Sequence, residues 1–264
     1  MGRYSFSTLK FSRSWLELLA LGLWGALLLK YYFSGQLYLL IHPNYFFLVL
    51  GAGILLTGLV LLRGFWLLQS KGKSAPAAAE KHVNILPTML ASAILLLSAV
   101  SGFLIPPKVL ASQAALQRGV ADTLPLTKTQ ASSFRSTQAP EERTLLDWVR
   151  TLNAYPEPDA YLGQRAQVQG FVIHPAELGD DYLLLARFIL TCCAVDAYPV
   201  ALPIKLPESR ANYPADTWLK IKAVAIAENL PRLNEPGTER QLVLEATEIE
   251  VLPTPSDPYA FNDL

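Results

Sequence analysis

The chain has 264 residues, of which 52% are hydrophobic and only 17% are charged, and its mean hydropathy is +0.28. Soluble globular chains carry about 25% charged residues, so this composition excludes a disordered chain and favours a membrane protein. The 22 basic and 22 acidic residues balance, which excludes the basic excess of a polyphosphate-binding protein. Two cysteines are too few for a disulfide-rich scaffold.

The charges are divided unevenly along the chain. Residues 1–105 hold eight basic and two acidic residues, a net charge of +6, whereas residues 106–264 hold fourteen basic and twenty acidic residues, a net charge of −6. Such a division indicates two parts in different surroundings. We predict a transmembrane domain over 1–105, a linker over 106–140 and an extracytoplasmic β domain over 141–259.

Three apolar stretches predict three N-terminal transmembrane helices, at about 15–33, 45–68 and 85–105. A helix needs about 20 apolar residues to cross the hydrocarbon core of a bilayer. The first stretch could instead be a cleaved signal peptide, but bulky Tyr31–Phe33 stands at its exit, where a cleavage site needs small residues. Buried helices of a soluble protein are the other alternative, and they would leave this half little polar surface.

The basic residues predict the orientation of these helices, because positively charged loops stay in the cytoplasm. Arg3, Lys10 and Arg13 precede the first span, the connection 34–44 has no Lys or Arg, and the connection containing Lys71–Lys81 is basic. With three spans, the N-terminus is expected in the cytoplasm and the C-terminal domain outside it.

The second half is expected to begin with an amphipathic helix at Glu141–Leu152 and to continue as strands. Pro199 and Pro203 suggest that the third strand lies at an edge, and Asn229–Arg240 is expected to be a turn-rich loop. Five strands with few helices predict an all-β, OB-like five-stranded barrel. The predicted strands are Gln164–Ile173, Tyr182–Cys192, Tyr198–Leu206, Thr217–Ala227 and Gln241–Leu252.

The two cysteines, Cys192 and Cys193, are adjacent. Neighbouring residues of a strand point to opposite faces, so both thiols can reach one metal ion only if the chain bends there. Asp196 follows closely, and His174, at the end of the first strand, is the remaining candidate ligand. Thiolate, carboxylate and imidazole together suit a zinc-like ion.

Other interpretations of this half stay open. The cysteines could be small structural hydrophobes, with the barrel serving as a protein-interaction module. A thiol redox function needs positive charge near the thiolate, and Arg187 is the nearest candidate. OB-like barrels also bind nucleic acids, which the net charge of −6 opposes. No hydrolase motif or glycine-rich phosphate loop occurs in the sequence, so we do not expect an enzyme.

Two segments carry a resemblance to a known family. One is SGQLYLLIHP at Ser34–Pro43, and the other has the form Arg-Phe…Cys-Cys-x-x-Asp-x-x-Pro. Over nearly its whole length the sequence resembles the YcgQ-type family of bacterial permease subunits. The motif residues are Arg187, Phe188, Cys192, Cys193, Asp196 and Pro199.

The resemblance implies an accessory subunit of a multi-span permease of the YcgR type, in the bacterial inner membrane. Its partners would be that permease and the lipid bilayer, with no nucleic acid, and its cargo a small solute or metal ion, zinc above all. Family members commonly carry a histidine-rich stretch between the second and third spans. Lys71–Lys81 has no histidine here and His82 stands alone, so the Cys-Cys-Asp motif is the remaining candidate for metal chemistry.

Overall fold

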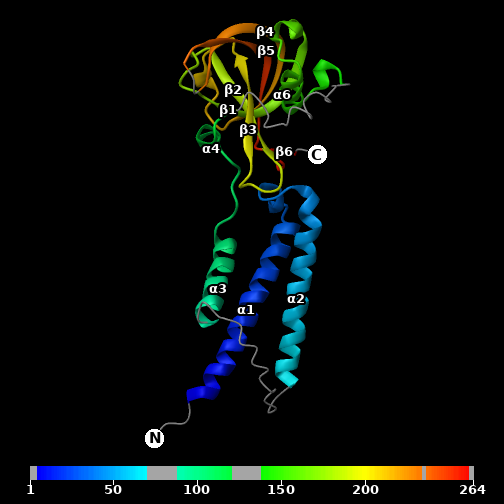
Figure 1. Cartoon of the computed structure of the whole chain (residues 1–264), viewed down its shortest axis with the longest axis vertical. Helices are drawn as coiled ribbons and strands as arrows, with labels where there is room; N and C mark the ends of the chain where they lie inside the picture. The colour runs from blue at the N-terminus through cyan, green and yellow to red at the C-terminus, as the bar shows by residue number, and fades with distance from the viewer. Residues whose placement is uncertain (1–4, 70–87, 121–137, 234–235, 262–264) are drawn as a thin grey trace. The chain divides into compact units, whose positions relative to one another are not determined.

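The computed structural model describes residues 5–69, 88–120, 138–233 and 236–261, with the backbone alone at 5–14, 88–89 and 261. The chain divides into two compact units, Met1–Lys108 and Val109–Leu264 (Figure 1). The predicted basic connection Lys71–Lys81 lies outside the described residues, as do residues 85–87 of the third predicted span.

The first unit is helical: α1 (Ser5–Phe33), α2 (Phe46–Gln69) and α3 (Thr88–Leu104). Two segments, Trp15–Phe33 and Pro43–Gln69, are helical, long and apolar enough to cross a membrane. The apolar part of α3, Leu90–Leu104, is shorter. The described residues therefore contain two such helices, and the third span stays a prediction.

Small residues and two polar contacts bring the three helices together. Figure 1 shows α1 and α2 side by side. A Cβ added at Gly25 would lie 2.8 Å from the Thr57 hydroxyl of α2, which shows how closely the two backbones approach. On the α3 side, the Trp24 indole donates to the Leu95 carbonyl (3.0 Å), and the Tyr31 hydroxyl donates to the Gly102 carbonyl (2.7 Å).

The second unit contains a closed five-stranded barrel, which confirms the predicted barrel. The strands pair in the order β1-β2-β3-β5-β4-β1, and every pairing is antiparallel except β3–β5. A short sixth strand pairs in parallel with β2. The strands are β1 (Arg165–Ile173), β2 (Tyr182–Leu190), β3 (Tyr198–Lys205), β4 (Trp218–Pro231), β5 (Thr238–Leu252) and β6 (Tyr259–Phe261).

The barrel closes because β1 serves two partners in succession. Arg165–Phe171 pairs with β4, and Phe171–Ile173 pairs with β2. At the change of partner, a Cβ on Gly170 would clash with the Ala186 carbonyl oxygen, so only glycine permits this approach. Alternate residues of the strands fill the interior, and Trp148 of α6 (Leu145–Ala154) packs against the same core.

The predicted loop Asn229–Arg240 is wrong, because β4 and β5 continue through most of it as a hairpin. Asn229 pairs with Arg240, and Pro231 pairs with Thr238. Gly237 has a φ of +116° and accepts a backbone hydrogen bond from Arg232 (3.0 Å). The prolines and glycine of this segment therefore mark the end of a hairpin and not a long loop.

The third strand is not the edge strand that its prolines suggested, since β3 lies between β2 and β5. Its pairing with β5 is nevertheless limited to Ile204–Leu244 and Lys205–Glu245. Pro203, just before these pairs, has no N–H to donate. We infer that the proline ends the β3–β5 ladder and leaves a seam between the two strands.

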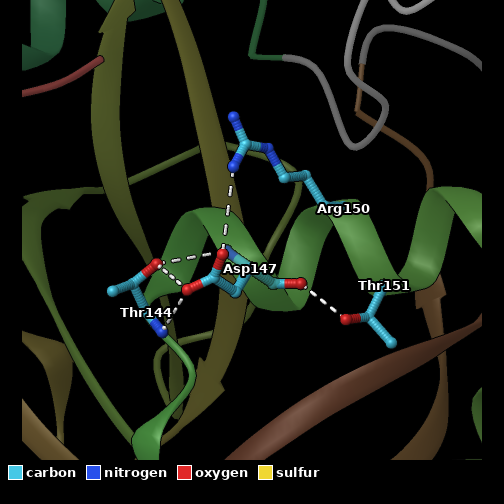
Figure 2. Close-up of polar contacts among 4 residues, drawn as sticks. All are labelled: Thr144, Asp147, Arg150 and Thr151. Carbon is cyan, nitrogen blue, oxygen red and sulfur yellow. Dashed lines mark hydrogen bonds and ion pairs between the residues drawn. The ribbon is translucent and has the colours of Figure 1, made fainter. Parts of the chain in front are cut away.

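The helix predicted at Glu141–Leu152 begins later than expected, at Leu145. Thr144 and Asp147 form a capping box, shown in Figure 2: the Thr144 hydroxyl accepts from the Asp147 N–H (3.2 Å), and the Asp147 carboxylate accepts from the Thr144 N–H (3.0 Å). Before it, Pro140–Glu142 forms a separate 3-10 turn. The cap fixes the first turn of α6, because it satisfies N–H groups that have no partner within the helix.

The segment Val109–Val120, hereafter the strap, belongs to the barrel unit rather than to a free linker. It contains the short helix α4 (Ser112–Arg118). Beneath it lies an aromatic cluster in which Phe171 stacks on Phe188 with ring centroids 5.5 Å apart, and the Arg118 guanidinium lies 6.0 Å from the Phe188 ring. Residues 121–137 of the predicted linker lie outside the described residues.

Candidate functional site

Cys192 and Cys193 lie in the turn between β2 and β3, whereas Cys192 was expected to be the last residue of the strand. β2 ends at Leu190. The Asp196 carboxylate accepts the Cys192 N–H at 2.8 Å through Oδ2 and the Cys193 N–H at 3.2 Å through Oδ1. The Asp196 N–H in turn donates to the Cys193 carbonyl at 3.1 Å. These bonds divert the backbone from the β ladder, so the strand ends two residues early.

The bend brings both sulfur atoms to one side. The Sγ atoms of Cys192 and Cys193 are 3.8 Å apart, and possible ligand atoms of Cys192, Cys193 and Asp196 all lie within 4.8 Å of one another. Two Zn–S bonds of about 2.3 Å at a tetrahedral angle would hold two sulfurs about 3.8 Å apart. Cys192 is exposed, and the other two residues are half-buried. The cluster could therefore hold a metal ion.

The charges around the thiols favour a proton or a cation. Hydrogen bonds from the Cys192 thiol, first to Asp196 and then to the Cys193 sulfur, raise the pKa of Cys192 to about 11. Burial acts to raise the pKa of Asp196, but hydrogen bonds from Cys192 and from the turn backbone outweigh burial and lower that pKa. At neutral pH the carboxylate is ionised and the Cys192 thiol keeps its proton. A metal ion would displace that proton.

Arg118 of the strap holds the cysteine turn from outside. Its Nη1 donates to the Ala194 carbonyl at 3.2 Å and also to the Ala197 carbonyl. The sequence analysis missed this residue, because 76 positions separate Arg118 from Ala194 and no local pattern links them. Only the course of the strap across the barrel brings them together.

The structure does not bring His174 to the cysteines. Ile173 pairs with Leu184 near the start of β2, whereas Cys192 follows the end of β2, so His174 lies at the other end of that strand. Burial, followed by the charge of Arg210, lowers the pKa of His174. Its Nε2 is buried and has no hydrogen-bond partner within the described part of the chain. The expectation that strand pairing would supply a fourth ligand is not met.

The remaining motif residues lie in the β2–β3 hairpin. Phe188 and Pro199 face each other across the β2–β3 ladder. Arg187 donates through Nη2 to the Asp257 carbonyl (3.2 Å), and its guanidinium lies 5.7 Å from the Trp218 ring. Arg187 is therefore not the thiolate-stabilising charge that a redox site needs.

A second feature is the cavity at the seam between β3 and β5, which no sequence pattern indicates. It has a volume of about 320 Å³ and is lined by Pro203, Leu242 and the end of α6. Asn153 contributes a buried Nδ2 without a hydrogen-bond partner among the described residues. At the rim, Arg240 pairs with Asp159, with Nε 2.9 Å from Oδ2.

These features define a class: a chain with two long apolar helices and a five-stranded barrel that carries a Cys-Cys-Asp turn. Comparison with family models gives the family to which such a chain belongs. Residues 16–121 match the DUF1980 N-terminal domain, and residues 129–262 match the DUF1980 C-terminal domain. The chain belongs to the DUF1980 family.

No curated protein matches the chain. Among solved structures, the chain is similar to the OBody AM3L09 bound to hen egg-white lysozyme. The sequence identity is 19%, the match covers 38% of this chain and 90% of that one, and the TM-score is 0.23. The barrel is therefore described from the strand pairings of this chain alone.

Proposed function

We propose that the protein is an accessory subunit of a multi-span permease of the YcgR type in the bacterial inner membrane. Three helices anchor it, and its OB-like barrel binds a metal ion, zinc, on the extracytoplasmic side. The observation that carries the proposal is the 3.8 Å separation of the Cys192 and Cys193 sulfurs beside the Asp196 carboxylate. That separation suits two bonds to one zinc ion.

The donor set favours an ion that is captured and passed on. Structural zinc sites use four protein ligands, whereas a site with three leaves a position open. Within the described residues the cluster offers three ligands, Cys192, Cys193 and Asp196. The open position would take water, a small solute or a donor from the permease, which fits a transport subunit.

The membrane part of the proposal rests on the helices and their flanking charges. Two helices are long enough to span, and the net charge of residues 1–105 is +6. If α3 is the third span, a reporter fused after Leu264 is active only outside the cytoplasm, and one fused within Lys71–Lys81 behaves oppositely. A cytoplasmic C-terminal reporter would refute both the third span and the extracytoplasmic site.

The metal site is tested with the purified full-length protein under reducing conditions. We expect about one zinc per chain and loss of most of the affinity in Cys192→Ser and in Cys193→Ser. Asp159→Asn is the matched control, since that exposed carboxylate pairs with Arg240 at the rim of the seam cavity and is not part of the Cys-Cys-Asp cluster, and it should keep full binding. Wild-type protein that takes up no zinc in a titration would exclude the site.

The affinity should also depend on pH in a defined direction. Binding releases the Cys192 proton, whose pKa is about 11. Below that pKa the thiol is protonated, so the apparent zinc affinity should rise about tenfold per pH unit for each proton released. A competition titration at pH 6, 7 and 8 measures the slope. A flat profile would show that the thiols are not the ligands.

The seam cavity favours a second candidate, a protein-interaction module in which the cysteines are structural. Its mixed lining, in which leucines and prolines are joined by Glu239, Arg240 and Gln241, and the unpartnered Asn153 amide suit a segment of another protein. In that case Gln241→Trp, which fills the cavity, should abolish co-purification with the permease, while Cys192→Ser should not. The thiol redox alternative is opposed by the raised pKa of Cys192, because the thiolate is the reactive form.

A further inference from the structure

The strap, Val109–Val120, is fastened to the barrel at both ends. Near its start, the Leu110 N–H donates to the Tyr259 hydroxyl at 3.1 Å, and the Ser112 N–H donates to Asp216 Oδ1 at 2.5 Å. At its far end, Arg118 donates to two carbonyls of the cysteine turn. The strap therefore connects the barrel's β3–β4 region to the turn that carries the candidate ligands.

The anchor at Asp216 is held in an uncommon backbone conformation. Its φ of +70° lies in the left-handed region, and it is the one non-glycine residue with positive φ in the described part of the chain. Such a conformation persists only where the surroundings require it. The Asp216 N–H donates to the Val172 carbonyl at 3.0 Å, and its side chain binds the first residue of α4. The strained residue thus fixes the start of the strap helix.

The anchor at Arg118 acts on the turn itself. Ala194 lies inside the turn closed by Cys193 and Asp196, and Ala197 follows it directly. Because one guanidinium binds both carbonyls, it fixes Ala197, just before β3, relative to Ala194 within the turn. The same guanidinium rests on the Phe188 ring, so the side chain has little freedom to move away.

We propose that Arg118 is a positioning residue for the cysteine turn, and that the strap thereby controls how tightly the turn retains its ion. The part that concerns the ion rests on the proposed function. If the strap lifts, Ala194 and Ala197 lose their shared donor, and the Asp196 carboxylate can leave the Cys192 and Cys193 N–H groups. The two sulfurs then no longer share one side.

The strap lies close in sequence to α3, so its contact through Arg118 could link ion binding in the barrel to the apolar helices. The strap follows the end of α3 at Leu104 after four residues, 105–108. A displacement of α3 during transport would therefore reach the strap through a short connection. Ion release from the barrel would be coupled in this way to the state of the apolar helices.

The test that does not depend on metal is amide hydrogen exchange of the full-length, metal-free protein in detergent. In Arg118→Gln, exchange of the Cys192 and Cys193 amides should become about tenfold faster, with the other barrel strands unchanged. Arg118→Lys, which keeps one charged donor, should restore part of the protection. Arg165→Gln is the control, because Arg165 is exposed and makes only a 3.8 Å ion pair with Glu141.

Asp216→Gly tests the other end of the strap. Glycine tolerates positive φ, so this variant should fold while it loses the carboxylate that holds Ser112. Faster exchange at the cysteine turn in Asp216→Gly would support control by the whole strap. Unchanged exchange of the turn in both Arg118→Gln and Asp216→Gly would overturn the proposal, whether or not the protein binds zinc.

Zinc titrations then separate the two proposals. If wild-type protein binds zinc, Arg118→Gln should weaken binding about tenfold, and Arg165→Gln should not. Equal zinc affinity of wild type and Arg118→Gln would overturn control of the ion by the strap. If wild-type protein takes up no zinc while the turn amides still respond to Arg118→Gln, the proposed function fails and the positioning of the turn by Arg118 stands.

Discussion

Leucine side chains are placed in opposite ways in the two units of the chain. In α2, Leu55 and Leu61 are 60% and 69% exposed, whereas Leu183 and Leu185 of β2 are completely buried. In the helical unit the residues that do face a neighbouring element include glycines such as Gly25, where the α1 and α2 backbones come close. In the barrel, the large apolar residues fill the interior and glycine is exceptional.

The exposed leucines of the helical unit are compatible with membrane insertion, since two of its helices are long and apolar enough to cross a bilayer. A soluble protein exposes scattered apolar residues, but a contiguous apolar surface indicates contact with lipid or another protein. A helix satisfies its own backbone hydrogen bonds, so it can present such a surface to lipid. The barrel buries its apolar residues, as a water-soluble domain must. Leucine therefore stabilises the barrel where it is buried, whereas the exposed leucines of α2 are compatible with contact with lipid.

The largest expected effect tests the barrel side of this comparison. Leu185→Ala removes a completely buried side chain and should lower the free energy of unfolding by about 2–5 kcal/mol. Leu61→Ala, at an outward position of α2, should change it far less. Denaturant unfolding of the full-length protein in detergent, followed by circular dichroism, measures both. Equal losses would mean that α2 packs as a soluble core helix.

The next effect compares two exposed positions. Leu55 of α2 and Val251 of β5 are 60% and 62% exposed. Leu55→Arg should disfavour membrane insertion by about 2.5–3.5 kcal/mol if α2 spans the bilayer. Val251→Arg should cost less than about 0.5 kcal/mol, because its surroundings are water. Fractionation of the expressed variants between membrane and soluble fractions measures this. If Leu55→Arg distributes between the fractions as wild type does, position 55 does not lie in hydrocarbon, which would contradict a spanning α2.

Much of the barrel could be predicted from the sequence, because alternation along a strand is a local property. In β4, Leu219 and Ile221 face the core while Lys220 and Lys222 do not. In β5, Ala246 and Ile249 both pack on the core although they are three residues apart, since a bulge shifts the register near Thr247. The sequence already showed that break in alternation, although nothing in it named the cause.

The site was predictable only where its contacts are local. Cys192, Cys193 and Asp196 lie within one turn, so their spacing alone indicated a cluster. Arg118 and His174 depend on how distant segments meet. Arg118 reaches the turn through the strap, whereas the β1–β2 register keeps His174 away from it. The capping box at Thr144 was a local signal that the prediction of α6 did not use.

A smaller effect compares two glycines. Gly170→Ala would place a Cβ against the Ala186 carbonyl oxygen and should cost about 1–3 kcal/mol, since backbone cannot yield as a flexible side chain does. Gly58→Ala of α2 has no atom within 4 Å of the new methyl group and should be neutral or slightly stabilising in a helix. Thermal melts of both variants measure this. A Gly170→Ala variant as stable as wild type would show that β1 and β2 do not approach as closely at this position as described.

The smallest effect concerns a hydroxyl in each unit. Thr144→Ala removes the oxygen that accepts the Asp147 N–H, so α6 should lose about 1 kcal/mol of stability. Thr144→Ser keeps that acceptor and should retain most of it. Thr57 of α2 instead donates to the Gly53 carbonyl of its own helix at 2.8 Å. The helix backbone already sets the position of that carbonyl, so Thr57→Ala should cost less stability than Thr144→Ala. Denaturant unfolding resolves the three variants. If Thr144→Ala and Thr144→Ser lost equal stability, packing of the threonine methyl group, and not the cap, would stabilise the start of α6.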